Sequence, residues 1–460
     1  MTEQEKEYFE ELVKDREENA RILSKDSMAG YRQSPIDKYS DRAHFIYEFL
    51  QNADDVKASK CKFALSRDGL LFEHNGIIPF KVSNPITEGK DRLIGNLGGV
   101  NAITAAGLST KSGNEIGRFG IGFKAVFQYT DEPRIYDDNI FFGLKKEIVP
   151  FLIKKDLSRR KPGETYFCVP FRANEKYRAY SDIKEKIESL KYPLLFLSNL
   201  KEISFESSGV SGQYTKEICD RKSYKDENQD INVEFIILKS KFGDNETRIK
   251  VLKFSKDTEA GRISVVFGIN NNDGTIKLDS LHGPAFCFFP TKKDTGLNFL
   301  IHAPFLLNDS REGIKEGTEH NNKLIHELAC LAVAAIYLFV SRFPLEVYNW
   351  FGRRVRGVKL VDDKILDYVP LKIEDKQDEI SLKAFEQKFR EVFSTQSVIP
   401  CQNGNRREIV YRKKENVCWS SDRGLINLLT SRQLGLLFGN NDICWGFSSV
   451  NSSNGCGQKV

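Results

Sequence analysis

The residues best suited to chemistry lie close together in one short segment, EFLQNADD at positions 48–55. Glu48, Asn52 and Asp55 are spaced i, i+4 and i+7, which places two carboxylates and one amide on a single face of a helix. Their oxygens are the hard ligands that Mg²⁺ prefers, and a carboxylate can also orient an attacking water. The alternative for this segment taken alone is a solvated polar stripe on an amphipathic helix.

A second segment, GRFGIGFK at 117–124, has three glycines around two phenylalanines, followed by an apolar-periodic run. A glycine turn that opens a helix presents backbone N–H groups and a positive dipole end to phosphate. The segment is neither a Walker A loop nor a Rossmann fingerprint, because the residues that define those motifs are absent. Glycine-rich turns are frequent, but the two segments in this order predict a nucleotide site more specifically than either alone.

The elements expected to position these residues alternate between helices and strands. We expect helices over 3–24 and through Glu48 to Val56, the latter with Asp41 as N-cap. A hairpin follows, with strands 60–66 and 70–73 around a turn at 67–69. Residues 84–116 are rich in Gly, Ser, Thr and Asn, a loop composition that favours a lid between the two motifs.

The rest of the chain is predicted to be α+β. The strands expected are 135–147, 164–171, 194–197, 203–205, 233–238, 248–254, 263–269, 286–289, 299–303 and 408–411, with a turn at 270–274. The helices expected are 181–190, 321–340 and 382–393, and 425–438 is expected to be a mixed or helical segment.

Composition narrows the class of protein. The 460 residues suggest two to four domains, and a net charge of +5 without a clustered basic face does not indicate nucleic acid. The nine cysteines form no C-x-x-C pair, which favours reduced thiols. The charged N-terminal helix is unlike a signal peptide, and the apolar run 328–340 is too short to cross a bilayer. We therefore expect a cytoplasmic protein without a membrane segment.

The two segments together resemble motifs of the GHKL ATPase superfamily, which includes the ninety-kilodalton heat-shock chaperones, DNA gyrase B and the sensor histidine kinases. EFLQNADD resembles the first family motif and GRFGIGFKAVF the third. With HNGIIPF between them, the wording is most similar to the sacsin-type, chaperone-like branch. The resemblance is strong over about 1–180 and extends more weakly to 345, through PLLFLSNLKEI, FCFFPT and APFLLNDSREGI.

The resemblance implies a fold and a domain division. It implies an N-terminal GHKL (Bergerat-type) α/β sandwich over 1–180 with a lid at about 84–116. An α+β middle domain over 181–345 and a small C-terminal α/β region over 346–460 would follow.

The resemblance also implies roles for individual residues. Glu48 matches the general base, Asn52 the Mg²⁺ ligand and Arg311 an arginine sent toward the γ-phosphate from the second domain. Asp55 matches an acid on the same helix face, and Lys124 either reaches phosphate or caps a helix. The implied nucleotide-binding set is Asn52, Asp55, His74, Asn75, Gly76, Lys111, Gly117, Phe119, Gly120, Ile121, Gly122, Phe123, Lys124 and Thr165.

One position departs from the family pattern. The second motif normally carries an aspartate that accepts a hydrogen bond from the adenine amino group, and here the triplet is His74-Asn75-Gly76. An imidazole nitrogen or an amide carbonyl can accept this bond but brings no negative charge. We therefore expect a weaker preference for adenine than in relatives that keep the aspartate.

The function implied is a chaperone-like ATPase that binds ATP with Mg²⁺ and couples it to conformational change, with a homodimer or a partner protein as further candidates. Two alternatives stay open: a nucleotide-binding switch with little turnover, and a DNA-processing or defence component driven by ATP binding. The sequence does not identify the client or pathway.

Overall fold

The computed structural model describes residues 1–26, 43–105, 123–226, 229–272, 275–308, 312–341, 345–348, 354–358, 368–370, 373, 379–402, 409–419, 428–446 and 458–459. The chain is α+β, as the sequence predicts, and it divides into two compact units. The first comprises Met1–Glu217 and Leu238–Arg248, and the second comprises Ile218–Ile237, Ile249–Asn308 and Glu312–Val460. The three-domain division at 180 and 345 stays a prediction.

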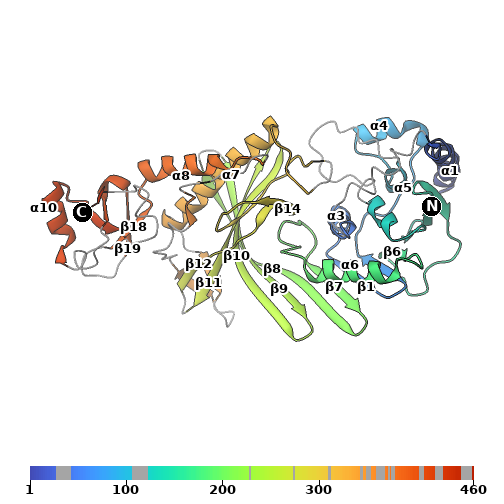
Figure 1. Cartoon of the computed structure of the whole chain (residues 1–460), viewed down its shortest axis with the longest axis horizontal. Coiled ribbons are helices and arrows are strands. Elements are labelled where there is room, and N and C mark those ends of the chain that lie inside the picture. Colours follow the sequence, from blue (N-terminus) through green and yellow to red (C-terminus); the bar gives the residue numbers. More distant parts are fainter. Residues whose placement is uncertain are drawn as a thin grey trace. The chain divides into compact units, whose positions relative to one another are not determined.

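The first unit is built on a mixed sheet with the strand order β7-β1-β2-β6-β3-β4-β5. Figure 1 labels β1, β6 and β7 among these strands. β1 pairs with β7 in parallel, and the other neighbours in this run are antiparallel. The strands are β1 (Lys60–Leu65), β2 (Gly69–His74), β3 (Arg134–Tyr136), β4 (Phe141–Lys145), β5 (Val149–Leu152), β6 (Thr165–Pro170) and β7 (Glu202–Ser207). The helices are α1 (Glu3–Leu23), α3 (Phe45–Asp55), η2 (Pro85–Thr87), α4 (Glu88–Leu93), α5 (Gly99–Thr104), η3 (Phe123–Gln128) and α6 (Lys176–Glu188).

Helix α3 packs on one face of this sheet through aromatic side chains. Phe49 of α3 stacks on Phe72 of β2 at a ring-centroid distance of 4.9 Å and lies 5.2 Å from Phe167 of β6. Successive strand residues point to opposite faces, so residues two positions from Phe72 and Phe167 face the same side as α3. The sheet therefore presents the ends of β2 and β6 to the helix that carries Glu48.

Several predicted elements of the first unit are confirmed. The N-terminal helix is α1, with Thr2 and Glu5 forming a capping box, and the predicted hairpin is β1 and β2. Asp41 lies outside the described residues, and α3 begins at Phe45 after His44, which makes no side-chain cap. The single strand expected over 135–147 is two strands, β3 and β4.

Two predictions in this unit are wrong. The described part of 84–116 is not loop alone, because it contains η2, α4 and α5. Leu194–Leu197 is buried but forms no strand. An apolar run of four residues does not distinguish a strand from a buried turn.

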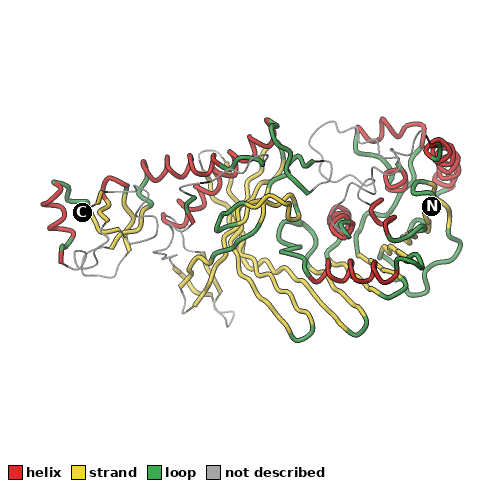
Figure 2. Tube along the Cα trace, in the orientation of Figure 1, coloured by secondary structure: helices red, strands yellow, loops and turns green. Residues whose placement is uncertain are grey.

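The second unit centres on long antiparallel strands, drawn in yellow in Figure 2. Parts of β8 (Val210–Asp226), β9 (Gln229–Phe242) and β10 (Asn245–Thr258) belong to each unit. The other strands of the sheet are β11 (Gly261–Asn272), β12 (Thr275–Asp279), β13 (Pro284–Cys287), β14 (Phe289–Asp294) and β15 (Leu300–His302). β11 continues through Asn270 to Asn272, where we predicted a turn.

Helix α7 (Glu319–Ser341) forms the core of this unit with the sheet and α8 (Lys383–Thr395). Phe339 of α7 contacts Phe254 and Phe267 edge to face at 5.2 and 5.1 Å. Within the described residues, Glu319–Val340 is long and apolar enough to span a membrane, although the apolar run 328–340 alone is too short, and 56% of its most apolar window is buried inside the protein.

The remaining elements of the second unit are small. They are a hairpin of β16 (Leu345–Tyr348) and β17 (Arg354–Val358), and a sheet of β18 (Ile399–Gln402), β19 (Ile409–Arg412), β20 (Val417–Trp419), β21 (Cys444–Gly446) and β22 (Gln458–Lys459). A short 3₁₀ turn, η5 (Lys414–Asn416), precedes β20. Leu434 of α10 (Ser431–Phe438) packs against Cys418 and Trp445 of this sheet.

Candidate nucleotide site

Glu48 and Asn52 are buried on α3, with 8% and 7% of their surfaces exposed. This burial argues against the solvated stripe that the sequence left open for these two residues. Asp55, one turn beyond Asn52, is exposed. The structure therefore places a carboxylate and an amide, one turn apart, on the part of α3 that is withdrawn from water.

Asp55 lies close to two other carboxylates, those of Asp54 and Glu48. Partial desolvation raises the pKa of Asp55 to about 7, and repulsion from Asp54 and Glu48 acts in the same direction. Because the side chain remains at the surface, a cation can approach it and relieve this repulsion.

Helix α3 is fastened at both ends by buried polar groups. At its start, the Tyr129 hydroxyl accepts a bond from the Ala43 N–H at 3.1 Å and donates to Asp182 at 3.3 Å. At its end, the Asp54 carboxylate accepts three backbone N–H bonds, at 2.7 to 2.9 Å, from Ser198, Asn199 and Leu200. Sequence reasoning assigned no role to Asp54, because nothing local in the sequence distinguishes it from Asp55.

His74 and Thr165 face each other as Cα partners at the ends of β2 and β6. Both are buried, with 5% and 3% exposed. The His74 ring lies 5.8 Å from Phe72 and 5.9 Å from Phe167, the two rings that α3 covers. The structure thus brings these two predicted base-binding residues together, on the sheet face that α3 occupies.

Asp137 is a buried acid beside this pair that sequence reasoning missed. Its carboxylate accepts a bond from the Thr165 hydroxyl at 2.8 Å and from the Phe80 and Asn139 N–H groups at 3.2 and 3.0 Å. Burial raises the pKa of Asp137, although these bonds oppose the shift. It follows β3 without any motif, so only the pairing of β3 with β6 reveals its place.

The other two residues of the His-Asn-Gly triplet bond to neighbouring backbone. Asn75 accepts from the Ser59 and Lys60 N–H groups at 2.9 Å each and donates to the Ser59 hydroxyl. A Cβ atom at Gly76 would lie 2.3 Å from Val56 Cγ2, so only glycine fits against the end of α3. Both residues thus fix the turn that follows His74.

Most of the predicted phosphate segment lies outside the described residues: Lys111, Gly117, Phe119, Gly120, Ile121 and Gly122. Phe123 and Lys124 begin η3, and the Phe123 ring lies 6.1 Å from Phe49. The Lys124 ammonium donates to the Ala105 carbonyl just after α5. Burial lowers the pKa of Lys124 to about 8. In this structure the Lys124 ammonium thus bonds a carbonyl at the end of α5, and its contact with phosphate stays a prediction.

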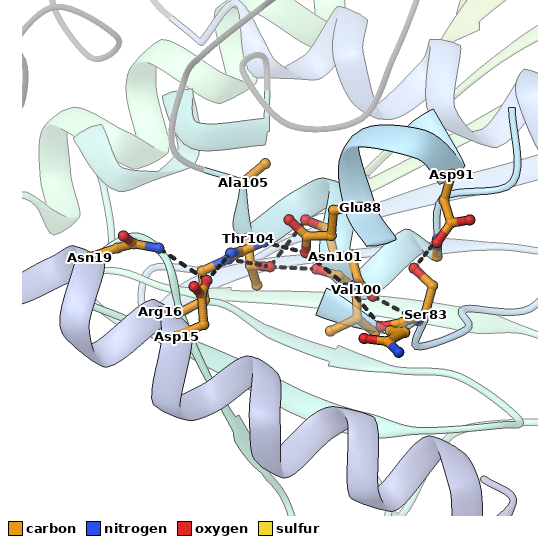
Figure 3. A network of polar contacts seen from close by, with 12 residues as sticks. Asp15, Arg16, Asn19, Ser83, Glu88, Asp91, Val100, Asn101, Thr104 and Ala105 are labelled. Carbon is orange, nitrogen blue, oxygen red and sulfur yellow. Dashed lines mark hydrogen bonds and ion pairs between the residues drawn. The ribbon is translucent and has the colours of Figure 1, made fainter. Parts of the chain in front are cut away.

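A buried network, shown in Figure 3, ties the described part of the predicted lid to α1. Arg16 of α1 donates to Glu88 at 2.5 Å and to the Thr104 hydroxyl at 3.4 Å. Asn101 donates to Glu88 at 2.9 Å and exchanges bonds with the Ser83 backbone at 2.8 and 2.9 Å. Helices α4 and α5 are each six residues long, and this network compensates for their shortness.

Arg311 also lies outside the described residues, but its flanks are anchored in the second unit. The Asn308 N–H donates to the Gly313 carbonyl at 2.9 Å, and the Gly313 N–H donates to the Asn308 side chain at 3.1 Å. Glu312 is buried and pairs with Lys292 at 2.6 Å.

The described residues fit a magnesium ion held mainly by its nucleotide. No group of three or more His, Cys, Asp or Glu side chains in the described ranges could hold a metal by itself. Mg²⁺ commonly keeps several waters and takes one or two protein oxygens plus substrate phosphates. The Asn52 amide could supply one such oxygen, and the crowded carboxylates beside it favour a cation.

Comparison with known proteins gives limited information. No family model matches the chain. The protein NO VEIN of Arabidopsis thaliana is 28% identical over 337 residues, which cover 66% of this chain and 11% of the relative, so the chain spans about a ninth of that protein. A solved chain titled "Crystal Structure of N terminal domain of a DNA repair protein" is 9% identical, with a TM-score of 0.32 over 64% of this chain and 93% of its own.

Proposed function

We propose that the first unit binds a purine nucleoside triphosphate with Mg²⁺ and hydrolyses it, as the resemblance to the GHKL superfamily implies. The observation that carries the proposal is the burial of Glu48 and Asn52 on α3, over the sheet face that holds His74 and Thr165. Glu48 orients the attacking water, and Asn52 holds the metal. The metal neutralises phosphate charge when bound.

In this proposal the nucleotide cycle drives a conformational change, as in chaperone-like relatives. Arg311 would come from the loop between Asn308 and Glu312, two residues that belong to the second unit, and its planar guanidinium suits phosphate oxygens. A switch with little turnover is the second candidate, favoured by the presence of His74 where the resemblance leads us to expect an aspartate.

Thermal unfolding tests nucleotide binding. Ligand at a hundredfold excess over Kd should stabilise the native protein by about 2.7 kcal/mol, and so raise Tm. Asn52→Ala should remove the Mg²⁺-dependent part of that rise, whereas Asn245→Ala, at an exposed amide that begins β10, should not. The absence of any rise with millimolar ATP, GTP or ITP would reject the proposal.

A further inference from the structure

The hydrogen bonding of His74 specifies which ring nitrogen carries its proton. The Gly76 N–H donates to His74 Nδ1 at 3.1 Å. A backbone N–H can only donate, so Nδ1 must be the unprotonated nitrogen. In a neutral imidazole the proton is then on Nε2, which becomes a hydrogen-bond donor.

The turn around Gly76 makes this arrangement hard to reverse. The Ile77 N–H donates to the Val56 carbonyl at 2.9 Å, and Gly76 packs closely on the Val56 side chain. The Gly76 N–H is therefore held in place by the end of α3. Burial also lowers the pKa of His74 to about 4, so the ring is neutral at neutral pH.

Nε2 has no hydrogen-bond partner among the residues that the structure describes, although 95% of the His74 surface is buried (5% exposed). Nε2 is not among the fully buried side-chain atoms that lack a partner in the described ranges, so this donor keeps contact with solvent. A ligand acceptor can replace that solvent. The His74 donor is thus available to a ligand on the α3 side of the sheet.

Thr165 offers the opposite polarity at the facing position. Its hydroxyl donates to Asp137 Oδ2, while Asp137 Oδ1 accepts the Phe80 and Asn139 N–H groups. A hydroxyl has one proton, so Thr165 can only accept a further bond. His74 and Thr165 therefore present a donor beside an acceptor.

We infer that the His74 and Thr165 pair selects a purine with a carbonyl group at C6, guanine or hypoxanthine, over adenine. The inference rests on the proposed nucleotide site, in which the residue at position 74 faces the exocyclic group at C6. A 6-oxopurine then places its O6 acceptor against the Nε2–H of His74 and its N1–H donor against Thr165. Adenine places an amino donor against a donor and the N1 acceptor against an acceptor.

Calorimetric titration with the Mg²⁺ complexes of ITP and ATP tests this selectivity, because the two bases differ only at C6 and N1. The wild-type protein should bind ITP at least about tenfold more tightly than ATP, because adenine mismatches both polar contacts and one such mismatch already costs about tenfold. His74→Asp, which replaces the donor by an acceptor, should reverse the order. His326→Asp, an equal charge change at an exposed position of α7, should leave the order unchanged.

A second measurement does not depend on a variant that folds. Two-bond ¹⁵N–¹H spectra of the wild-type protein should show His74 with a protonated Nε2 and an unprotonated Nδ1. ATP binding to the wild type as tightly as ITP, or the opposite tautomer, would overturn the inference while leaving the nucleotide site standing. If none of ATP, GTP and ITP binds, the nucleotide site itself fails.

Discussion

Glu48 is buried on α3, and in the proposed site it orients water without holding the nucleotide. Glu48→Gln and Glu48→Ala should therefore lower turnover by roughly 100-fold or more and change nucleotide affinity little. Phosphate release and calorimetry measure the two quantities. Glu73→Gln is the matched control, because Glu73 points to the opposite face of β2 from Phe72 and His74. A Glu48→Gln variant with wild-type turnover would favour the switch.

The raised pKa of Asp55 predicts that the free energy of unfolding depends on pH. Its pKa rises from the ordinary value of 3.8 to about 7 on folding, so between these values the native state binds more protons than the unfolded chain. Its contribution to stability is present below pH 3.8 and is lost as pH rises through 7.

Asp55→Asn should consequently raise Tm more at pH 8 than at pH 4, and Mg²⁺ should reduce the gain. Thermal unfolding across this range, with and without Mg²⁺, measures both effects. An equal change in Tm at the two pH values would show that Asp55 is not crowded by its neighbours.

At the scale of elements, an ion pair joins the buried Arg16 guanidinium to the partly buried Glu88 carboxylate, with side-chain exposures of 6% and 18%. Removing Arg16 takes the charged partner from Glu88, which keeps its bond from Asn101, at a cost of about 1–3 kcal/mol. Arg16→Ala should lower Tm and speed amide hydrogen exchange in residues 83–104. Lys6→Ala is the control, because it removes an exposed ion pair, with Glu3, on the same helix. Its cost should stay below about 1 kcal/mol. If the amides of residues 83–104 exchange equally fast in the two variants, the Arg16 contacts of α1 do not stabilise this segment.

The sequence predicts elements well where the periodic pattern is long. Helix α1 is found at Glu3–Leu23 against 3–24 expected, because a capping box and a 21-residue pattern mark it. Composition did not predict α4 and α5, because Gly99 and Thr104 are poor helix formers. The two helices are stabilised by the bonds from Arg16 of α1 to Glu88 and Thr104. Such contacts join segments far apart in the sequence and leave no local pattern.

The residues of the candidate site also differ in whether a local sequence pattern predicts them. Glu48 and Asn52 follow from helical spacing, and His74 from its motif. Asp54 and Asp137 escaped notice because their partners, Leu200 and Thr165, are distant in the sequence. The tautomer of His74 depends on where one backbone N–H points, which residue types alone do not specify.

At the scale of the whole molecule, Arg311 predicts coupling between the units. Its neighbours Asn308 and Glu312 belong to the second unit, so in this proposal the position of that unit controls whether Arg311 reaches the nucleotide. Its contact would form mainly in the reacting state, so Arg311→Ala should slow turnover with little change in nucleotide affinity. Arg311→Lys should also be slow, because lysine lacks the planar fork. The control is Arg262→Ala, which removes an exposed pair with Asp257 in the same unit. If Arg311→Ala has wild-type turnover, this segment resembles the family in fold only, and Arg311 has no role in hydrolysis.

The anchoring of α3 by Asp54 has a consequence for synthesis on the ribosome. Leu200, which the Asp54 carboxylate binds, lies 146 residues further along the chain, and β7, the parallel partner of β1, follows it. At about 5–20 residues per second, this delay lasts roughly 7–30 seconds. During that interval the end of α3 lacks the three backbone donors that the Asp54 carboxylate accepts. The nascent chain should therefore need a ribosome-associated chaperone until β7 has emerged. Fragments that end before β7 should aggregate.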